Sequence, residues 1–174
     1  MIRLPHLLRP ACAALALICL AGCAGYSLGP TNGLEVGEKS IQVTPFANQT
    51  VEPRLTDEVT QQMRKVLQRD RTYRLATHDD GDIVLSGSIV SYTRHELSFL
   101  RTDTLTVKDF RITMTAQVTA RERSTGKVVL DQRVTGRTII RVGADLVSSE
   151  RQALPSLAED LAKNVTSLLA DGTF

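Results

Sequence analysis

The strongest constraint on the fold is a strict alternation of side chains between Phe110 and Glu122. Successive side chains of a β-strand point to opposite faces of the sheet, so a period of two predicts a strand with one apolar and one polar face. The apolar positions are Ile112, Met114, Ala116, Val118 and Ala120, and the polar ones are Arg111, Thr113, Thr115, Gln117, Thr119 and Arg121. We therefore expect one side of a sheet to be buried, while the other side is rich in threonine and arginine.

Other strand patterns lie on both sides of this segment. Pro45 indicates that the first strand, Ser40–Phe46, ends there or forms an edge of the sheet. Residues Glu96 to Lys108 break the alternation and predict either a loop or an extension of the neighbouring strands. The expected strands are Ser40–Phe46, Tyr73–Ala76, Asp82–Arg94 and Val128–Arg141.

One amphipathic helix is expected after the first strand. Pro53 suits its first turn, where a missing N–H costs nothing, and the helix should end near Arg69. Its apolar residues recur with the period of a helix, which is typical of a helix that packs on a core. They are Leu55, Val59, Met63, Val66 and Leu67.

A second amphipathic helix is expected at the end of the chain. Ser148 or Ser149 is the predicted cap of its first turn, and Gly172 follows its last turn. Pro155 lies within the pattern, so the helix should either start or bend there. Its wide apolar stripe consists of Leu154, Leu157, Ala158, Leu161, Val165, Leu168 and Leu169.

Together, these elements predict an α+β fold. Two apolar helix stripes and one apolar sheet face form a two-layer sandwich, with both helices on one face of a mixed, mostly antiparallel sheet of four to five strands. Residues 40–174 are expected to form this sandwich as a single domain.

The N-terminus resembles a lipoprotein signal. Basic residues precede an apolar run from Ala11 to Ala21, and Leu20-Ala21-Gly22-Cys23 then resembles a bacterial lipobox. This motif implies that residues 1–22 are removed and that Cys23 receives lipid. The alternatives are an ordinary signal peptide or a transmembrane helix, although the run is short for a bilayer.

The segment 23–39 reads as a lipidated linker, rich in glycine, proline, threonine and asparagine. By resemblance to lipoprotein sorting, Ala24 in place of an aspartate favours the outer membrane. Two or three acyl chains bind a membrane essentially permanently, so the folded part would be tethered and not embedded.

Composition excludes several classes of function. Loss of Arg3 and Arg9 with the signal would balance the 21 basic residues against the 19 acidic ones, which gives no support for nucleic-acid binding. Cleavage and lipidation would also leave no free thiol, so a disulfide scaffold is not expected. A chain of about 150 residues is one domain of ordinary size.

The inventory of reactive side chains does not favour an enzyme. His78-Asp79-Asp80 and Asp82 have the residue types of a metal site, but they lie in a predicted turn, where such residues are common. Neither a nucleophile-elbow motif nor a phosphate-binding glycine loop occurs. We therefore expect no catalytic site, no metal and no cofactor apart from the covalent lipid.

The polar sheet face has two interpretations. It is either simply hydrated or packed against another polar surface, such as the hydrophilic lumen of an outer-membrane barrel. Basic residues near strand ends and in the central loop suit contacts with phosphates or carboxylates, although scattered arginines are usually solvated. They are Arg94, Arg101, Lys108, Arg111, Arg137 and Arg141.

With these features, the chain resembles the lipopolysaccharide-assembly lipoprotein family, LptE. The resemblance spans nearly the whole chain, but it depends on pattern and order because the family has no catalytic signature. The matching segments are Gly22-Cys23-Ala24-Gly25-Tyr26-Ser27-Leu28, Ile41–Phe46 with Asn48-Gln49-Thr50, Pro53-Arg54-Leu55, Asp82–Ile89, the strand around Arg111–Thr115, and Ser124–Val128.

This resemblance implies partners. Members of the family sit as a plug inside the barrel LptD, assist its folding and help it to deliver lipopolysaccharide to the outer leaflet. Contact with lipopolysaccharide is implied for basic residues of the loop between the two long strands, where Arg101 is the nearest equivalent and Lys108 and Arg94 flank it.

A rival interpretation comes from another class of protein. Outer-membrane lipoproteins that regulate peptidoglycan synthases share a similar strand, an Asn-x-Thr turn and a following helix. A pull-down that recovers either a barrel or a penicillin-binding protein separates the two.

Overall fold

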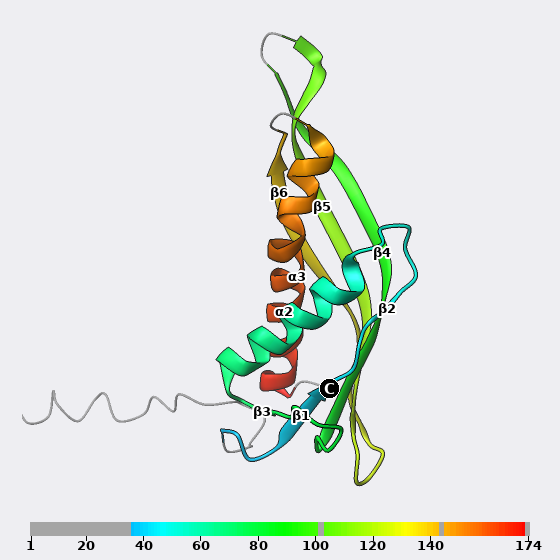
Figure 1. Ribbon diagram of the computed structural model, residues 1–174, viewed down its shortest axis with the longest axis vertical. Helices are drawn as coiled ribbons and strands as arrows, with labels where there is room; N and C mark the ends of the chain where they lie inside the picture. Colours follow the sequence, from blue (N-terminus) through cyan, green and yellow to red (C-terminus); the bar gives the residue numbers. More distant parts are fainter. Residues whose placement is uncertain (1–35, 101–102, 143–144, 173–174) are drawn as a thin grey trace, which may run out of the picture.

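The computed structural model describes residues 36–100, 103–142 and 145–172, with the backbone alone for residues 98–100 and 103–108. Helices α2 (Leu55–Asp70) and α3 (Leu146–Asp171) lie on one face of a mixed sheet, which confirms the predicted α+β fold (Figure 1). The strands are β1 (Ser40–Val43), β2 (Ala47–Asn48), β3 (Arg74–Leu75), β4 (Ile83–Leu100), β5 (Asp103–Glu122) and β6 (Val128–Arg141).

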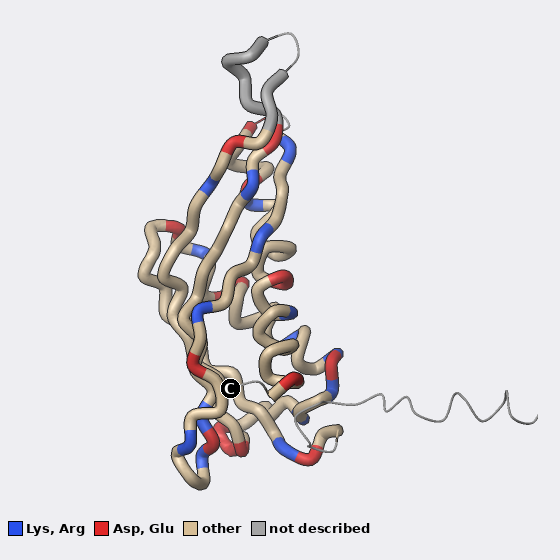
Figure 2. Tube along the Cα trace, turned by 180° about the vertical axis from the view of Figure 1, so that it is seen from behind, with Lys and Arg blue, Asp and Glu red and all other residues tan. Residues whose placement is uncertain are grey.

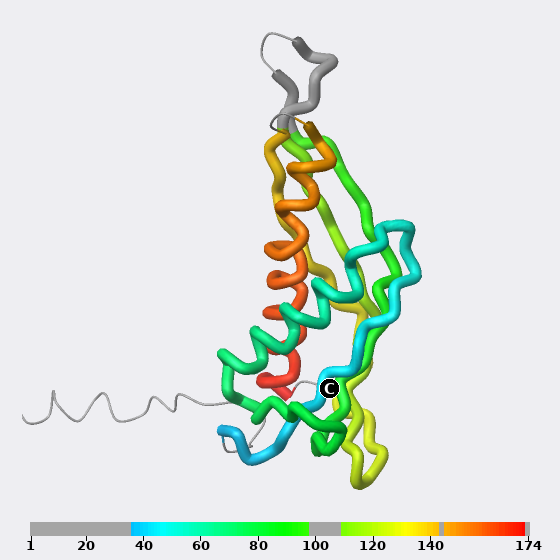
Figure 3. The backbone as a smooth tube through the Cα atoms, in the orientation of Figure 1, coloured from blue at the N-terminus to red at the C-terminus, as the bar shows by residue number. Residues whose placement is uncertain are grey.

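The sheet combines a parallel and an antiparallel half. Its strand order is β3-β1-β4-β5-β6, and β2 also pairs with β4. The three long strands β4, β5 and β6 are antiparallel, whereas the short strands β1, β2 and β3 pair in parallel. Figure 3 shows α2 crossing α3 in front of this sheet, so the apolar stripes of both helices meet the same core.

The first predicted strand is divided in two. β1 ends at Val43, and the backbone N–H and hydroxyl of Thr44 both donate to the carbonyl of Leu85, at 2.9 and 3.0 Å. Pro45 is exposed and has no N–H to continue the ladder. Pairing then resumes with β2, which is why the described sheet has six strands instead of four to five.

In its described part, the segment that breaks the alternation extends the neighbouring strands. β4 continues to Leu100, which pairs with Asp103 at the start of β5. β6 ends at Arg141, opposite Asp109, so the β4–β5 hairpin projects beyond the rest of the sheet (Figure 1). We call this the hairpin end of the molecule, and the end that carries the β5–β6 turn, residues 122–128, the turn end.

A β-bulge in β4 reverses which side chains face the helices. Ile89 lies opposite Ala116, but Ser91 lies opposite Thr115, so Val90 is an extra residue. Odd-numbered residues such as Ile89 are buried before the bulge. After it, Tyr92 is opposite the buried Met114 and therefore faces the helix layer.

Two glycines allow close packing of the layers. A Cβ on Gly136 would lie 2.7 Å from the backbone nitrogen of Leu161 and 2.8 Å from the carbonyl oxygen of Leu157, so α3 rests directly on β6. A Cβ on Gly87 would overlap the ring of Phe46, whose side chain is 1% exposed. Both positions therefore require glycine for packing reasons.

The start of α3 differs from the prediction. Asp145 is the N-cap, and its carboxylate accepts a hydrogen bond from the N–H of Ser148 at 2.7 Å, so the predicted caps Ser148 and Ser149 already belong to the helix. Hydrogen bonds from the backbone N–H and the side chain of Ser148 lower the pKa of Asp145. Pro155 does not start the helix but lies exposed within it, and Gly172 ends it in the left-handed conformation, as predicted.

Candidate functional site

The candidate interaction site is the sheet face opposite the helices, which we call the polar face. Strands β4, β5 and β6 form it, and in the described part of the chain neither helix covers it (Figure 2). The strand register aligns its side chains in rows of three across the sheet. From the turn end to the hairpin end, the rows are Ser86, Thr119 and Asp131; Ser88, Gln117 and Arg133; Ser91, Thr115 and Thr135; Thr93, Thr113 and Arg137; and His95, Arg111 and Ile139.

Side chains in the middle and at the turn end of the polar face bond to each other. The amide of Gln117 donates to the carboxylate of Asp131 at 2.7 Å, and the hydroxyl of Thr119 donates to the same oxygen at 3.2 Å. The hydroxyls of Thr115 and Thr135 are 3.2 Å apart. These cross-strand bonds hold the polar groups in fixed positions, which reduces the entropy that a partner would have to remove on binding.

The hairpin end of the polar face is more basic. Arg111 on β5 lies between His95 on β4 and Ile139 on β6. Arg137 precedes Ile139 by two residues in β6, so both side chains are on the same face. Ile139 is 63% exposed. Next to them, the guanidinium of Arg141 lies 3.0 Å from the carboxylate of Asp109.

A buried acid ties the base of the hairpin to α3. Glu150 is 9% exposed, and its two oxygens accept hydrogen bonds from the Tyr92 hydroxyl at 2.5 Å and from the Arg94 guanidinium at 2.7 Å. Burial, together with the hydrogen bond to Glu150, raises the pKa of the Tyr92 hydroxyl. The cluster exists because the bulge at Val90 turns Tyr92 and Arg94 toward the helices.

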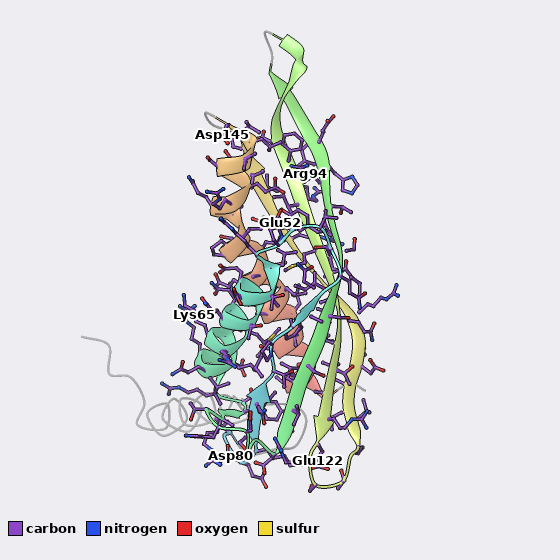
Figure 4. The ribbon with its side chains drawn as sticks, turned by 45° about the vertical axis from the view of Figure 1, so that its right-hand side comes forward. Glu52, Lys65, Asp80, Arg94, Glu122 and Asp145 are labelled. Atoms are coloured by element: carbon purple, nitrogen blue, oxygen red, sulfur yellow. The ribbon has the colours of Figure 1, made fainter. Side chains whose placement is uncertain are left out.

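The predicted lipopolysaccharide contacts are only partly within the described side chains. Arg94 lies toward the hairpin end, as Asp145 does (Figure 4), and its side chain is 45% exposed although it pairs with Glu150. Lys108 is described by its backbone in β5, while Arg101 lies outside the described residues, as does the lipidation candidate Cys23. The assignment of these four residues stays a prediction.

The turn that holds His78 has structural hydrogen bonds. Asp79 accepts from Gln42 at 2.7 Å, and Asp82 accepts from both the N–H and the hydroxyl of Ser40, at 2.8 and 2.6 Å. Among the described residues, no group of three or more histidine, cysteine, aspartate or glutamate side chains is arranged to hold a metal ion.

The polar face also has a concave region at its turn end. It has a volume of about 450 Å³ and is lined by Val84, Ser86, Thr119, Arg121, Glu122, Arg123 and Gly126. Arg121 donates to the carbonyl of Gly126 at 2.7 Å, and Arg123 donates to the carbonyl of Gly81 at 2.8 Å. Both guanidinium groups therefore support the turns around this region.

The described part of the chain is a small α+β sandwich with an open polar sheet face, and the comparison with protein families gives its class. The family model for lipopolysaccharide assembly, LptE, matches residues 38–169, so the chain belongs to the LptE family. This family consists of non-enzymatic lipoproteins of the bacterial envelope. Among curated protein sequences, none matches the chain.

Solved structures share the fold at low sequence identity. The protein CT253 from Chlamydia trachomatis has a TM-score of 0.56 and 9% identity, over 78% of this chain and 98% of that one. The PelC dodecamer from Paraburkholderia phytofirmans has a TM-score of 0.51 and 20% identity, over 83% and 96%. A minor lipoprotein from Acinetobacter baumannii has a TM-score of 0.50 and 14% identity, over 76% and 92%.

The two described helices, α2 and α3, form the helix layer of the sandwich. Neither of them is both long enough and apolar enough to cross a membrane.

Proposed function

We propose that this protein is an outer-membrane lipoprotein that plugs the barrel LptD, assists its assembly and takes part in transporting lipopolysaccharide to the cell surface. Membership of the LptE family supports this role. The observation that carries it is the polar face, because both helices pack on the opposite side and leave a broad hydrophilic surface open. The lumen of an outer-membrane barrel is also polar, so the two surfaces match chemically.

We further propose that the protein is held by lipid on Cys23 after removal of residues 1–22. The chain between Cys23 and Val36, the first described residue, spans at most about 45 Å when it is fully extended. This length lets the folded part reach a barrel near its anchor without entering the bilayer itself.

The proposed lipopolysaccharide contacts are Lys108 on the projecting hairpin, Arg94 at its base, and Arg101, which lies outside the described residues. Arginine and lysine form strong, charge-assisted hydrogen bonds with phosphate groups. The position of the hairpin supports this role, because it extends beyond β6 at the end of the molecule farthest from the β5–β6 turn. Arg94 already pairs with Glu150, so an anionic ligand would have to compete with that carboxylate.

A pull-down from detergent-solubilised cells tests the plug role. We expect the full-length protein with a C-terminal tag to recover a large heat-modifiable barrel. Recovery of a penicillin-binding protein in its place would favour the role of a synthase regulator, and turnover of a substrate by the purified protein would contradict both.

Depletion of the protein tests the transport role separately. Lipopolysaccharide should disappear from the cell surface while its synthesis continues. Normal surface lipopolysaccharide in depleted cells would contradict the proposal even if a barrel is recovered in the pull-down.

A further inference from the structure

At the hairpin end of the polar face, two arginines have no ion-pair partner among the described side chains. Arg111 and Arg137 are both exposed, and neither side chain forms an ion pair with any residue that the structure describes. Strand register makes them diagonal neighbours, and such neighbours lie about 7–8 Å apart on one face of a sheet. The exposed Ile139 lies opposite Arg111 and two residues from Arg137 on the edge strand β6. We call Arg111, Arg137 and Ile139 the basic patch.

Two carboxylates near this patch already have other partners. Asp160 on α3 accepts a hydrogen bond from the backbone N–H of Arg137 at 2.8 Å. Asp109 lies 3.0 Å from the guanidinium of Arg141, in the row beyond Ile139. Neighbouring like charges on a sheet are unfavourable, so the basic patch does not stabilise the isolated fold. At the turn end, by contrast, Asp131 bonds with its neighbours on the same face. The polar face is therefore electrostatically uneven along its length.

We propose that the basic patch docks against an acidic stretch of the partner barrel's inner wall. This inference rests on the proposed plug function. It adds which part of the polar face contacts the barrel and that the contacted part of the barrel wall is acidic. Carboxylates accept paired hydrogen bonds from arginine, and Ile139 offers one apolar contact beside the two guanidinium groups. Complementary charge would also fix the register of the plug in the barrel and disfavour wrong orientations.

A protein wall fits the patch better than a whole lipid molecule, which has acyl chains as well as phosphates. Acyl chains need an apolar groove, whereas the patch lies on paired strands and Ile139 is its one apolar member. The concave region of the polar face lies at its turn end, several rows away. A surface with two guanidinium groups and one aliphatic side chain is complementary in charge to an acidic protein surface.

Charge reversal in the full-length lipoprotein tests the inference. The test variant is Arg111→Glu with Arg137→Glu, and the matched control is Lys65→Glu with Arg151→Glu, which changes the net charge equally. Lys65 lies on α2 away from the sheet (Figure 4), and both control side chains are exposed. Each protein is purified from cells in detergent, and two quantities are measured: the amount of barrel recovered and the binding of purified lipoprotein to lipopolysaccharide.

We expect the test variant to recover about tenfold less barrel than the control, with lipopolysaccharide binding unchanged. The milder variant, Arg111→Gln with Arg137→Gln, should reduce barrel recovery less, because it removes the attraction without adding repulsion. It replaces the charge-reversed variant as the test if that variant folds poorly. Equal recovery by all variants would overturn the proposed patch, as would a loss confined to lipopolysaccharide binding. If the wild-type protein recovers no barrel, both this inference and the proposed function fail.

Discussion

Glu150 illustrates how one side chain connects two elements of this fold. It is the acceptor for both Tyr92 and Arg94, and its carboxylate is nearly inaccessible to solvent. A buried donor that loses its acceptor pays the full cost of desolvation, which makes this cluster sensitive to substitution.

We expect Glu150→Ala to lower the free energy of unfolding by about 1–3 kcal/mol. The loss should not exceed this range, because Arg94 is partly exposed and solvent screens its ion pair with Glu150. Glu150→Gln should cost less, because its amide oxygen can still accept from Tyr92. Urea denaturation of both variants measures the difference. Equal losses would mean that the hydrogen bond to Tyr92 contributes little.

Among the elements, β5 contributes side chains both to the buried core and to the polar face. Its alternating residues are fully buried on one side and partly exposed on the other. The short strands β1, β2 and β3 complete the sheet beside β4 but contribute few positions to the polar face.

Thr115→Arg in the middle of β5 should weaken barrel association without unfolding the protein. The change removes one hydroxyl pair with Thr135, which is worth less than about 1 kcal/mol, but it places a long charged side chain in the proposed interface. Thermal unfolding and barrel recovery are compared with Thr115→Ser, which keeps the hydroxyl. A large drop in Tm for the arginine variant alone would mean that this face is buried within the protein.

The start of β4 makes stability depend on pH. Hydrogen bonds from the hydroxyl and N–H of Ser40 lower the pKa of Asp82 below its ordinary value of 3.8. A group with a lowered pKa in the folded state stabilises the fold above its ordinary pKa, and this contribution disappears as the pH falls through the lowered value. Near it, the hydrogen bond from Lys39 lowers the pKa of Glu122, so both carboxylates act in the same direction.

We therefore expect the free energy of unfolding to fall as the pH drops below about 4.5, and Asp82→Asn to reduce this dependence. The stability of Asp82→Asn should be lower than that of the wild type at pH 7 and approach it in acid. The exposed Asp80 provides the control substitution Asp80→Asn. Parallel curves for the wild type and Asp82→Asn would contradict this assignment.

At the scale of the whole molecule, the two ends have different proposed tasks. Asp80 and Glu122 lie at the turn end, whereas Arg94 and Asp145 lie at the hairpin end (Figure 4). In the proposed function, the hairpin end carries the lipopolysaccharide contacts and the basic patch, and the polar face between the ends meets the barrel.

Cys23→Ala should release the protein into the soluble periplasmic fraction, because without acyl chains the chain loses its proposed anchor. Fractionation with antibody detection measures this. Retention in the membrane that disappears when the barrel is depleted would support the plug role. Retention without the barrel would show that Cys23 is not the anchor.

The sequence alone was sufficient for the elements whose pattern is local. The alternation in β5 predicted the two faces of the sheet, the helical stripes predicted α2 and α3, and the order of the motifs indicated the LptE family, which the family model confirms. These features depend on periods of two or 3.6 residues, which are visible in any short window of the chain.

Only the tertiary structure decided which side chains meet. One extra residue at Val90 turned Tyr92 and Arg94 toward Glu150, and strand register brought Arg111 beside Arg137. Asp145, rather than Ser148 or Ser149, caps α3 because the helix begins earlier than its apolar stripe. Bulges and cross-strand register join residues that are distant in sequence, so no periodicity along the chain reveals them.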